Sequence, residues 1–136
     1  MTNWRAVIIG FLVATVLGIL GLAIPGVGQL AAGLIGGFVA GYVAGGGLLR
    51  GFWHGLLAGA LGGLVGGLLI AVFVGLAGWT LGPAGAMISG AAGLGILALA
   101  IFVSFVMALE SAIAGALGGL LNPDRPDYRG YDAPRY

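Results

Sequence analysis

Cysteine is absent from this sequence of 136 residues, and charged residues make up only 7% of it. The absence of cysteine excludes disulfides, thiolate metal sites and cysteine nucleophiles. With His54 as the single histidine, a metal site lacks ligands, and we expect neither a metal nor a cofactor. All five basic residues are arginines, they are dispersed, and the net charge is +1. We therefore do not expect nucleic acid as a partner.

Catalytic motifs are also missing. No nucleophile, general base and orienting residue can be combined into a set, so we expect no enzyme activity. The many Gly-xxx-Gly matches do not follow a predicted strand, which excludes a nucleotide-binding loop.

Apolar residues and glycine dominate the chain. Hydrophobic residues make up 60% of it, glycine contributes 30 residues, and the mean hydropathy is +1.16. These values lie far outside the usage of globular proteins, and the apolar runs are long enough to cross a bilayer. The sequence therefore predicts an all-α, multi-pass membrane protein with about four spans of about 20 residues, and the lipid bilayer as its surroundings.

Turn residues divide the apolar sequence into four predicted helices. The first begins near Asn3 and ends at Pro25, the second covers about 30–49, and the third covers about 51–78. No turn signal follows within 84–121, a length of about 57 Å as one helix. We expect one long or kinked last helix; the alternative is a re-entrant piece over 84–94 before a span over 97–121.

Two parts of the chain differ in composition. Residues 1–121 are predicted to form the transmembrane four-helix domain. Residues 122–136 hold three each of Pro, Asp, Arg and Tyr with almost no aliphatic residues, so we expect a disordered, polar, cytoplasmic tail. This tail is a candidate docking segment for a protein partner.

Glycine recurs at every fourth residue along the second and third predicted helices, which places it on one helix face. In water each such glycine costs about 1 kcal/mol relative to alanine. In lipid, small residues instead let helices approach closely. We expect the two glycine ridges to pack against each other, within one chain or between copies in a homo-oligomer. The predicted packing glycines are Gly33, Gly37, Gly41, Gly45, Gly51, Gly55, Gly59, Gly63, Gly67, Gly115 and Gly119.

Arginine placement predicts the orientation. With four spans, all five arginines fall on one side of the membrane, and the turns at Pro25 and Pro83 hold no charge. The positive-inside rule then places both termini in the cytoplasm. Aromatic and polar residues near the helix ends are expected at the headgroups, with the imidazole of the single histidine reaching toward them. These expected anchors are Trp4, Arg5, Arg50, Trp53, His54 and Trp79.

Glu110 is the one acidic residue before the tail. It lies about 16 Å from the predicted cytoplasmic end of its helix, where an ionised group costs at least about 2.5 kcal/mol. Three interpretations stay open: a protonated or hydroxyl-bonded carboxyl that joins helices, a proton or cation site, and a carboxylate near the interface of a longer helix. The hydroxyls expected near its level are those of Thr15, Tyr42, Ser104 and Ser111.

The chain resembles a family of small, glycine-rich haloarchaeal membrane proteins of unknown function. The resemblance covers about residues 3–121 and is clearest over 4–11, Pro25-Gly26-Val27-Gly28, the ladder from Gly33 to Gly45, and 52–55. It implies a four-helix protein of the cell membrane and no activity.

Two functions follow as expectations. The first is a structural or scaffolding membrane protein that assembles through glycine-zipper packing. The alternative is a small ion or proton channel or transporter that uses Glu110. The four hydroxyls near Glu110 are few for a permeation route, so we favour the structural role.

Overall fold

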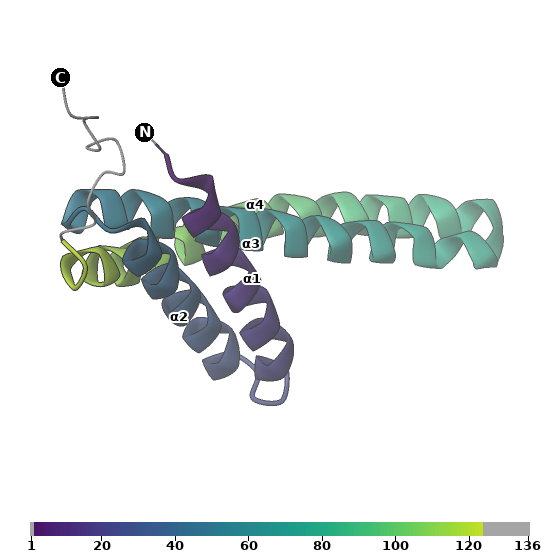
Figure 1. Ribbon diagram of the computed structural model, residues 1–136. Coiled ribbons are helices and arrows are strands. Elements are labelled where there is room, and N and C mark those ends of the chain that lie inside the picture. The colour runs from purple at the N-terminus through teal and green to yellow at the C-terminus, as the bar shows by residue number, and fades with distance from the viewer. Residues whose placement is uncertain (1, 124–136) are drawn as a thin grey trace, which may run out of the picture.

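The computed structural model describes residues 2–123, which form four α-helices (Figure 1). They are α1 (Trp4–Gly21), α2 (Val27–Ala44), α3 (Leu48–Ala77) and α4 (Gly82–Leu120), with the 3-10 turn η1 (Gly78–Leu81) between α3 and α4. The all-helical class predicted from the sequence is confirmed. The tail was predicted to be disordered, and its residues 124–136 lie outside the residues that the structure describes.

The turn between α2 and α3 differs from the prediction. Helix α2 ends at Ala44 rather than Leu49, and α3 begins at Leu48 rather than Gly51. Gly45, Gly46 and Gly47 separate them with φ of 59°, 80° and 90°. L-residues with a side chain rarely adopt such angles. The apolar pattern hid this turn because three consecutive glycines there looked like part of the glycine ladder.

Helix α4 runs without interruption from Gly82 to Leu120. This confirms the long last helix and rules out the separate re-entrant piece expected as the alternative. Pro83 lies in its first turn, where a residue without an N–H causes no loss of helical hydrogen bonding. Pro83, which the sequence analysis placed in a turn, therefore belongs to the first turn of α4.

The four helices form two hairpins of unequal length (Figure 1). Helices α3 and α4 lie side by side as one long antiparallel hairpin, and the shorter hairpin of α1 and α2 crosses it near one end. Helix α2 contacts both α3 and α4, whereas α1 contacts α2 and α3. The part of the long hairpin near η1 is left uncovered, so the four helices of the predicted domain do not form a compact bundle.

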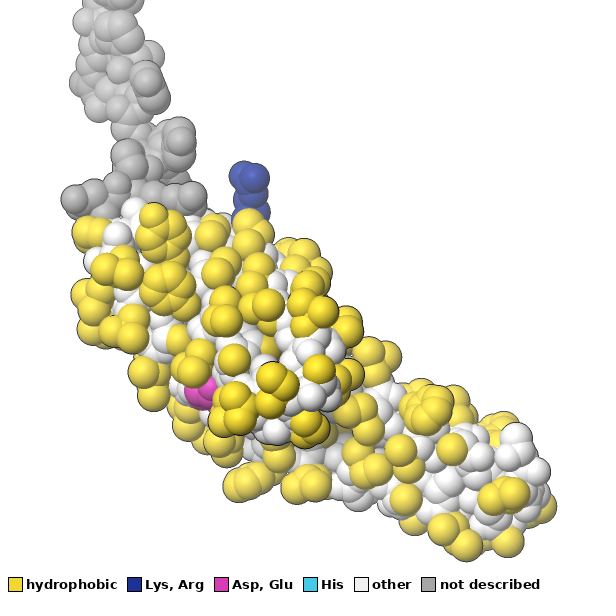
Figure 2. Space-filling view, turned by 90° about the horizontal axis from the view of Figure 1, so that it is seen from below, with side chains coloured by type: hydrophobic (Ala, Val, Ile, Leu, Met, Phe, Trp, Pro, Cys, Tyr) yellow, Lys and Arg dark blue, Asp and Glu magenta, His cyan; other side chains and the backbone are white. Residues whose placement is uncertain are grey.

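Small residues form the interior of this fold. Among the buried residues are Ala6, Ala40, Ala58 and Ala112, while large aliphatic and aromatic side chains face outward. Figure 2 shows hydrophobic side chains over the whole length of the visible face. Three segments, 4–21, 27–44 and 48–120, are long and apolar enough to cross a membrane. An apolar exterior of this extent fits lipid and would be a liability in water.

Glycines of α3 lie directly against α4. A Cβ added at Gly59 would come within 2.6 Å of the Ser111 Cβ and 3.0 Å of the Ala108 Cα. At Gly63 it would overlap the Ser104 side chain, and at Gly67 it would overlap the Ala100 Cβ. The two backbones are therefore as close as glycine permits over several turns.

Replacing Gly59 with leucine should lower the free energy of unfolding by about 3 kcal/mol or more, because the added atoms overlap α4. Gly66→Leu is the matched control, since a Cβ there meets nothing within 4 Å and both changes remove a glycine from the middle of α3. Unfolding of the two variants in lipid or detergent should be compared. Equal stabilities would mean that the α3–α4 contact is not formed.

Candidate functional site

The glycines of α2 meet the middle of α4. A Cβ at Gly37 would overlap the carbonyl oxygen of Ser111, and a Cβ at Gly41 would overlap that of Gly115. The α2 ridge therefore lies against α4.

The same two residues of α4 also face α3. A Cβ at Gly55 would overlap the Ser111 carbonyl oxygen and lie 2.9 Å from the Gly115 Cα. Conversely, a Cβ at Gly115 would lie 2.6 Å from the Gly51 oxygen and 3.1 Å from the Gly37 oxygen. Helix α4 thus contacts both α2 and α3 at Ser111 and Gly115. We expected the two ridges to pack against each other; instead both lie against the small residues of α4.

Ser111 adds a hydrogen bond to this junction. Its side chain is 1% exposed, and its hydroxyl donates to the Gly55 carbonyl at 2.8 Å. Ser104, two turns earlier, donates to the Ala100 carbonyl of its own helix. Of the two serines, Ser111 alone bonds across the helix pair.

Gly33, at the start of the α2 ladder, has a different neighbour. A Cβ there would lie 3.8 Å from Oε1 of Glu110 and 3.8 Å from Cε of Met107. Oε1 is buried and has no hydrogen-bond partner among the described residues. Glu110 therefore places one carboxyl oxygen against the bare backbone of α2.

The hydroxyls expected to pair with Glu110 do not bond to its buried Oε1. Thr15 donates to the Phe11 carbonyl within α1. Tyr42 is about half exposed, and its ring stacks on Phe38 at a centroid distance of 6.2 Å. Ser104 and Ser111 bond to backbone carbonyls as described. The structure thus does not show the hydroxyl-bonded carboxyl that we considered.

Glu110 is partly exposed and lies far from either end of the apolar helix α4. It stands ten residues before the end of α4 at Leu120, a distance of about 15 Å along the helix. An ionised carboxylate at this depth is costly, whereas a protonated one carries a single O–H donor. Within residues 2–123 no three metal-binding side chains come together. The carboxyl can hold a proton, but its surroundings do not make a cation cage.

A second polar group lies at the end of the molecule where α1 and α3 begin. The backbone N–H of Asn3 donates to Nε2 of His54 at 2.8 Å, and Nδ1 of His54 lies 2.6 Å from the Arg50 carbonyl. Trp53 Nε1 donates to Thr2 Oγ1 at 3.4 Å. We expected His54 to reach the headgroups, and this was wrong, because the side chain is 1% exposed.

The remaining expected anchors have mixed positions. Trp4, Arg5 and Trp53 are exposed at the end where α1 and α3 begin, and Trp79 is exposed in η1, at the opposite end of the long hairpin. Arg50 is partly buried, and its Nε has no hydrogen-bond partner in the described part of the chain.

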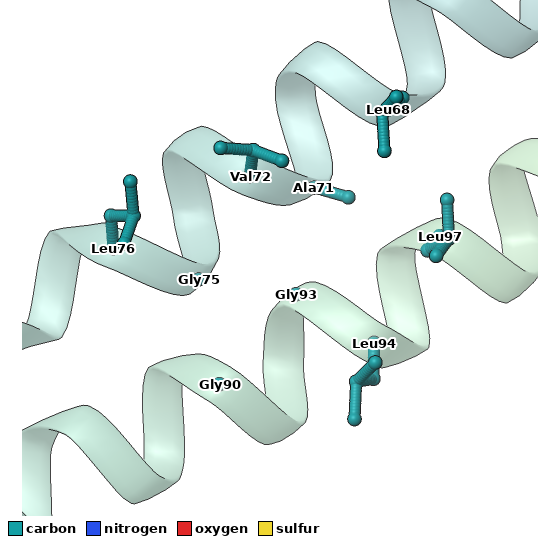
Figure 3. Close-up of a pocket in the computed structure, with 9 residues that line it drawn as sticks. All are labelled: Leu68, Ala71, Val72, Gly75, Leu76, Gly90, Gly93, Leu94 and Leu97. Carbon is teal, nitrogen blue, oxygen red and sulfur yellow. The ribbon is translucent and has the colours of Figure 1, made fainter.

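A groove of about 250 Å³ lies between α3 and α4 in the uncovered part of the long hairpin (Figure 3). Glycine and aliphatic residues line it, so it offers no side-chain hydrogen-bonding group. The lining residues are Leu68, Ala71, Val72, Gly75, Leu76, Gly90, Gly93, Leu94 and Leu97.

Sequence reasoning missed several close contacts. A Cβ at Gly36 would lie 2.8 Å from the Gly10 oxygen, and one at Gly118 would overlap the Phe38 oxygen. Gly36 and Gly118 each sit beside a ladder glycine in a Gly-Gly pair. Such pairs place small residues on two helix faces, and this was the signal that α2 and α4 each pack against more than one helix.

Replacing Glu110 with methionine, which has a similar length and no polar oxygen, should raise the free energy of unfolding by about 1–3 kcal/mol, because a buried unpaired oxygen is removed. Ser111→Ala should instead lower it by about 1 kcal/mol, because its interhelical hydrogen bond is lost. Unfolding in mixed micelles measures both. A destabilised Glu110→Met variant would show that the carboxyl is bonded in the membrane.

Comparison with known proteins yields a family but no activity. No curated protein and no solved structure matches the chain. The model of a family described as a family of unknown function, DUF5518, matches residues 4–121. This range includes all four helices and the junction at Ser111 and Gly115. The chain therefore belongs to the DUF5518 family of unknown function.

Proposed function

We propose that the chain is a structural or scaffolding multi-pass protein of the cell membrane, without catalytic activity, whose four helices assemble through Gly-xxx-Gly packing. The junction at Ser111 and Gly115 carries this proposal, because the backbones of α2, α3 and α4 meet there at distances that exclude a Cβ. Small residues at helix contacts are the usual basis of helix association in lipid.

The helix lengths support four spans. Helices α1 and α2, with 18 residues each, are about 27 Å long and match a hydrocarbon core of about 30 Å. Helices α3 and α4, with 30 and 39 residues, are about 45 Å and about 58 Å long, so they cross the same core when tilted and extend beyond it at their ends. The two hairpins diverge in Figure 1, so an upright short hairpin is compatible with a tilted long one.

The ends of the helices support a common orientation for the termini. The bond from Asn3 to His54 joins the starts of α1 and α3, and the bond from the Gly46 N–H to the Asn122 carbonyl joins the ends of α2 and α4. Arg5 and Arg50 lie at this end, so the positive-inside rule favours the cytoplasm for both termini.

A second copy of the chain is the partner we propose. Gly66, Gly90 and Gly95 lie within α3 and α4, and a Cβ at each would meet nothing within 4 Å. Glycines without an internal contact suit packing against another helix. From the sequence resemblance alone, we propose a haloarchaeal membrane as the setting. We also propose that the tail docks a protein partner; from residue 124 onward the tail lies outside the described residues.

A small ion or proton channel is the second candidate. The unpaired Oε1 of Glu110 favours it, since an ionisable group within a membrane is a functional candidate by default. Against it, the groove is aliphatic, and Thr15, Ser104 and Ser111 donate to backbone carbonyls. The polar lining that a permeation route needs is thus thin.

Single cysteines can test the four-span arrangement, because the chain has none of its own. Cysteines at Ala23 and Leu81, in the two turns away from the N-terminal end, should react with an impermeant thiol reagent from the same side of sealed vesicles. A cysteine at Leu49 should react from the opposite side. Labelling of Ala23 and Leu81 from opposite sides would contradict the four-span arrangement.

Ion and proton flux separates the two candidate functions. Liposomes that contain the native chain should show no flux above empty liposomes, and Glu110→Gln should give the same result. Flux that is present with the native chain and lost in Glu110→Gln would move the protein to the channel or transporter class.

A further inference from the structure

Both ring nitrogens of His54 have a hydrogen-bond partner in the structure. Its 1% exposed ring lies between the residue before α1 and the second turn of α3. A backbone N–H can only donate, so Nε2 must be the accepting nitrogen in the contact with Asn3. The proton of the neutral ring then sits on Nδ1 and is donated to the Arg50 carbonyl.

We propose that His54 is a proton-operated latch that holds the N-terminal end of α1 against α3. The neutral ring accepts the Asn3 N–H. A protonated ring has two N–H groups and no acceptor, so it would face the Asn3 N–H with another donor. Protonation therefore breaks this contact and releases Asn3, the residue that caps the start of α1, from α3.

The charges around the ring favour release on protonation. Arg50 stands four residues before His54 on the same helix, and its Nε has no hydrogen-bond partner among the described residues. Glu110, the one carboxylate within residues 2–123, lies against Gly33 of α2. No carboxylate in this range therefore compensates a second positive charge beside Arg50.

The other bonds at this end are longer. The side chain of Asn3 accepts from the Ala6 N–H at 3.4 Å, and Trp53 donates to Thr2 at 3.4 Å. Neither is as short as the 2.8 Å contact of Asn3 with His54. Without the histidine contact, the residues before α1 keep the longer bond from Trp53 to Thr2 as a hydrogen bond to α3, while Ala6 and Val7 of α1 stay buried.

A nitroxide spin label can report the release. Arg5 is exposed, and the chain has no other cysteine, so Arg5→Cys gives a single label near the start of α1. In phospholipid nanodiscs, the ratio of mobile to immobile label should rise about tenfold between about pH 8 and about pH 5. A label at Ala23, in the turn between α1 and α2, should not respond.

His54→Gln supplies the matched comparison. Its amide oxygen can accept the Asn3 N–H at every pH, so the label at Arg5 should stay immobile in acid. An equal rise with histidine and with glutamine, or no rise in either, would overturn the proposal. Nitrogen NMR of the unmodified chain tests it without a substitution at His54: a neutral ring protonated on Nε2 would also overturn it.

Discussion

The fold depends on direct contact between helix backbones at glycine positions, where no side chain keeps the helices apart. At Ser111 and Gly115, α4 touches both α2 and α3. Lipid supplies no hydrophobic force between helices, so association depends on packing distance and on bonds such as the one from Ser111 to Gly55. A β-carbon at several of these positions would push the helices apart. The close contact that glycine permits therefore offsets its low intrinsic helix propensity.

The sequence predicted the helical class, the long last helix and the faces that carry glycine, because these follow from hydropathy and a four-residue period. It did not predict which helix each face would meet. Periodicity assigns residues to one face of a helix, and the neighbour of that face depends on tertiary packing. The turn at Gly45, Gly46 and Gly47 was hidden for a related reason, since its positive φ angles leave no mark in a run of glycines.

Polar residues were harder to place than glycines. Glu110 was predicted to lie within a membrane span, but its contact with Gly33 depends on how α2 crosses α4, which the sequence does not show. His54 was expected at the headgroups because it follows Trp53, yet its neighbours include Asn3, which is 51 residues away. Contacts of this range bring together segments that local patterns treat separately.

The long hairpin is joined internally at two distant points. Ser111 donates to the Gly55 carbonyl, and Ser89 donates to the Gly75 carbonyl at 2.9 Å. Gly55 and Gly75 lie about 30 Å apart along α3, which is close to the thickness of the hydrocarbon core. Because α3 and α4 are joined at both points without help from α1, release of Asn3 from His54 leaves the long hairpin intact. The short hairpin can thus respond to a local change while the long hairpin keeps its shape.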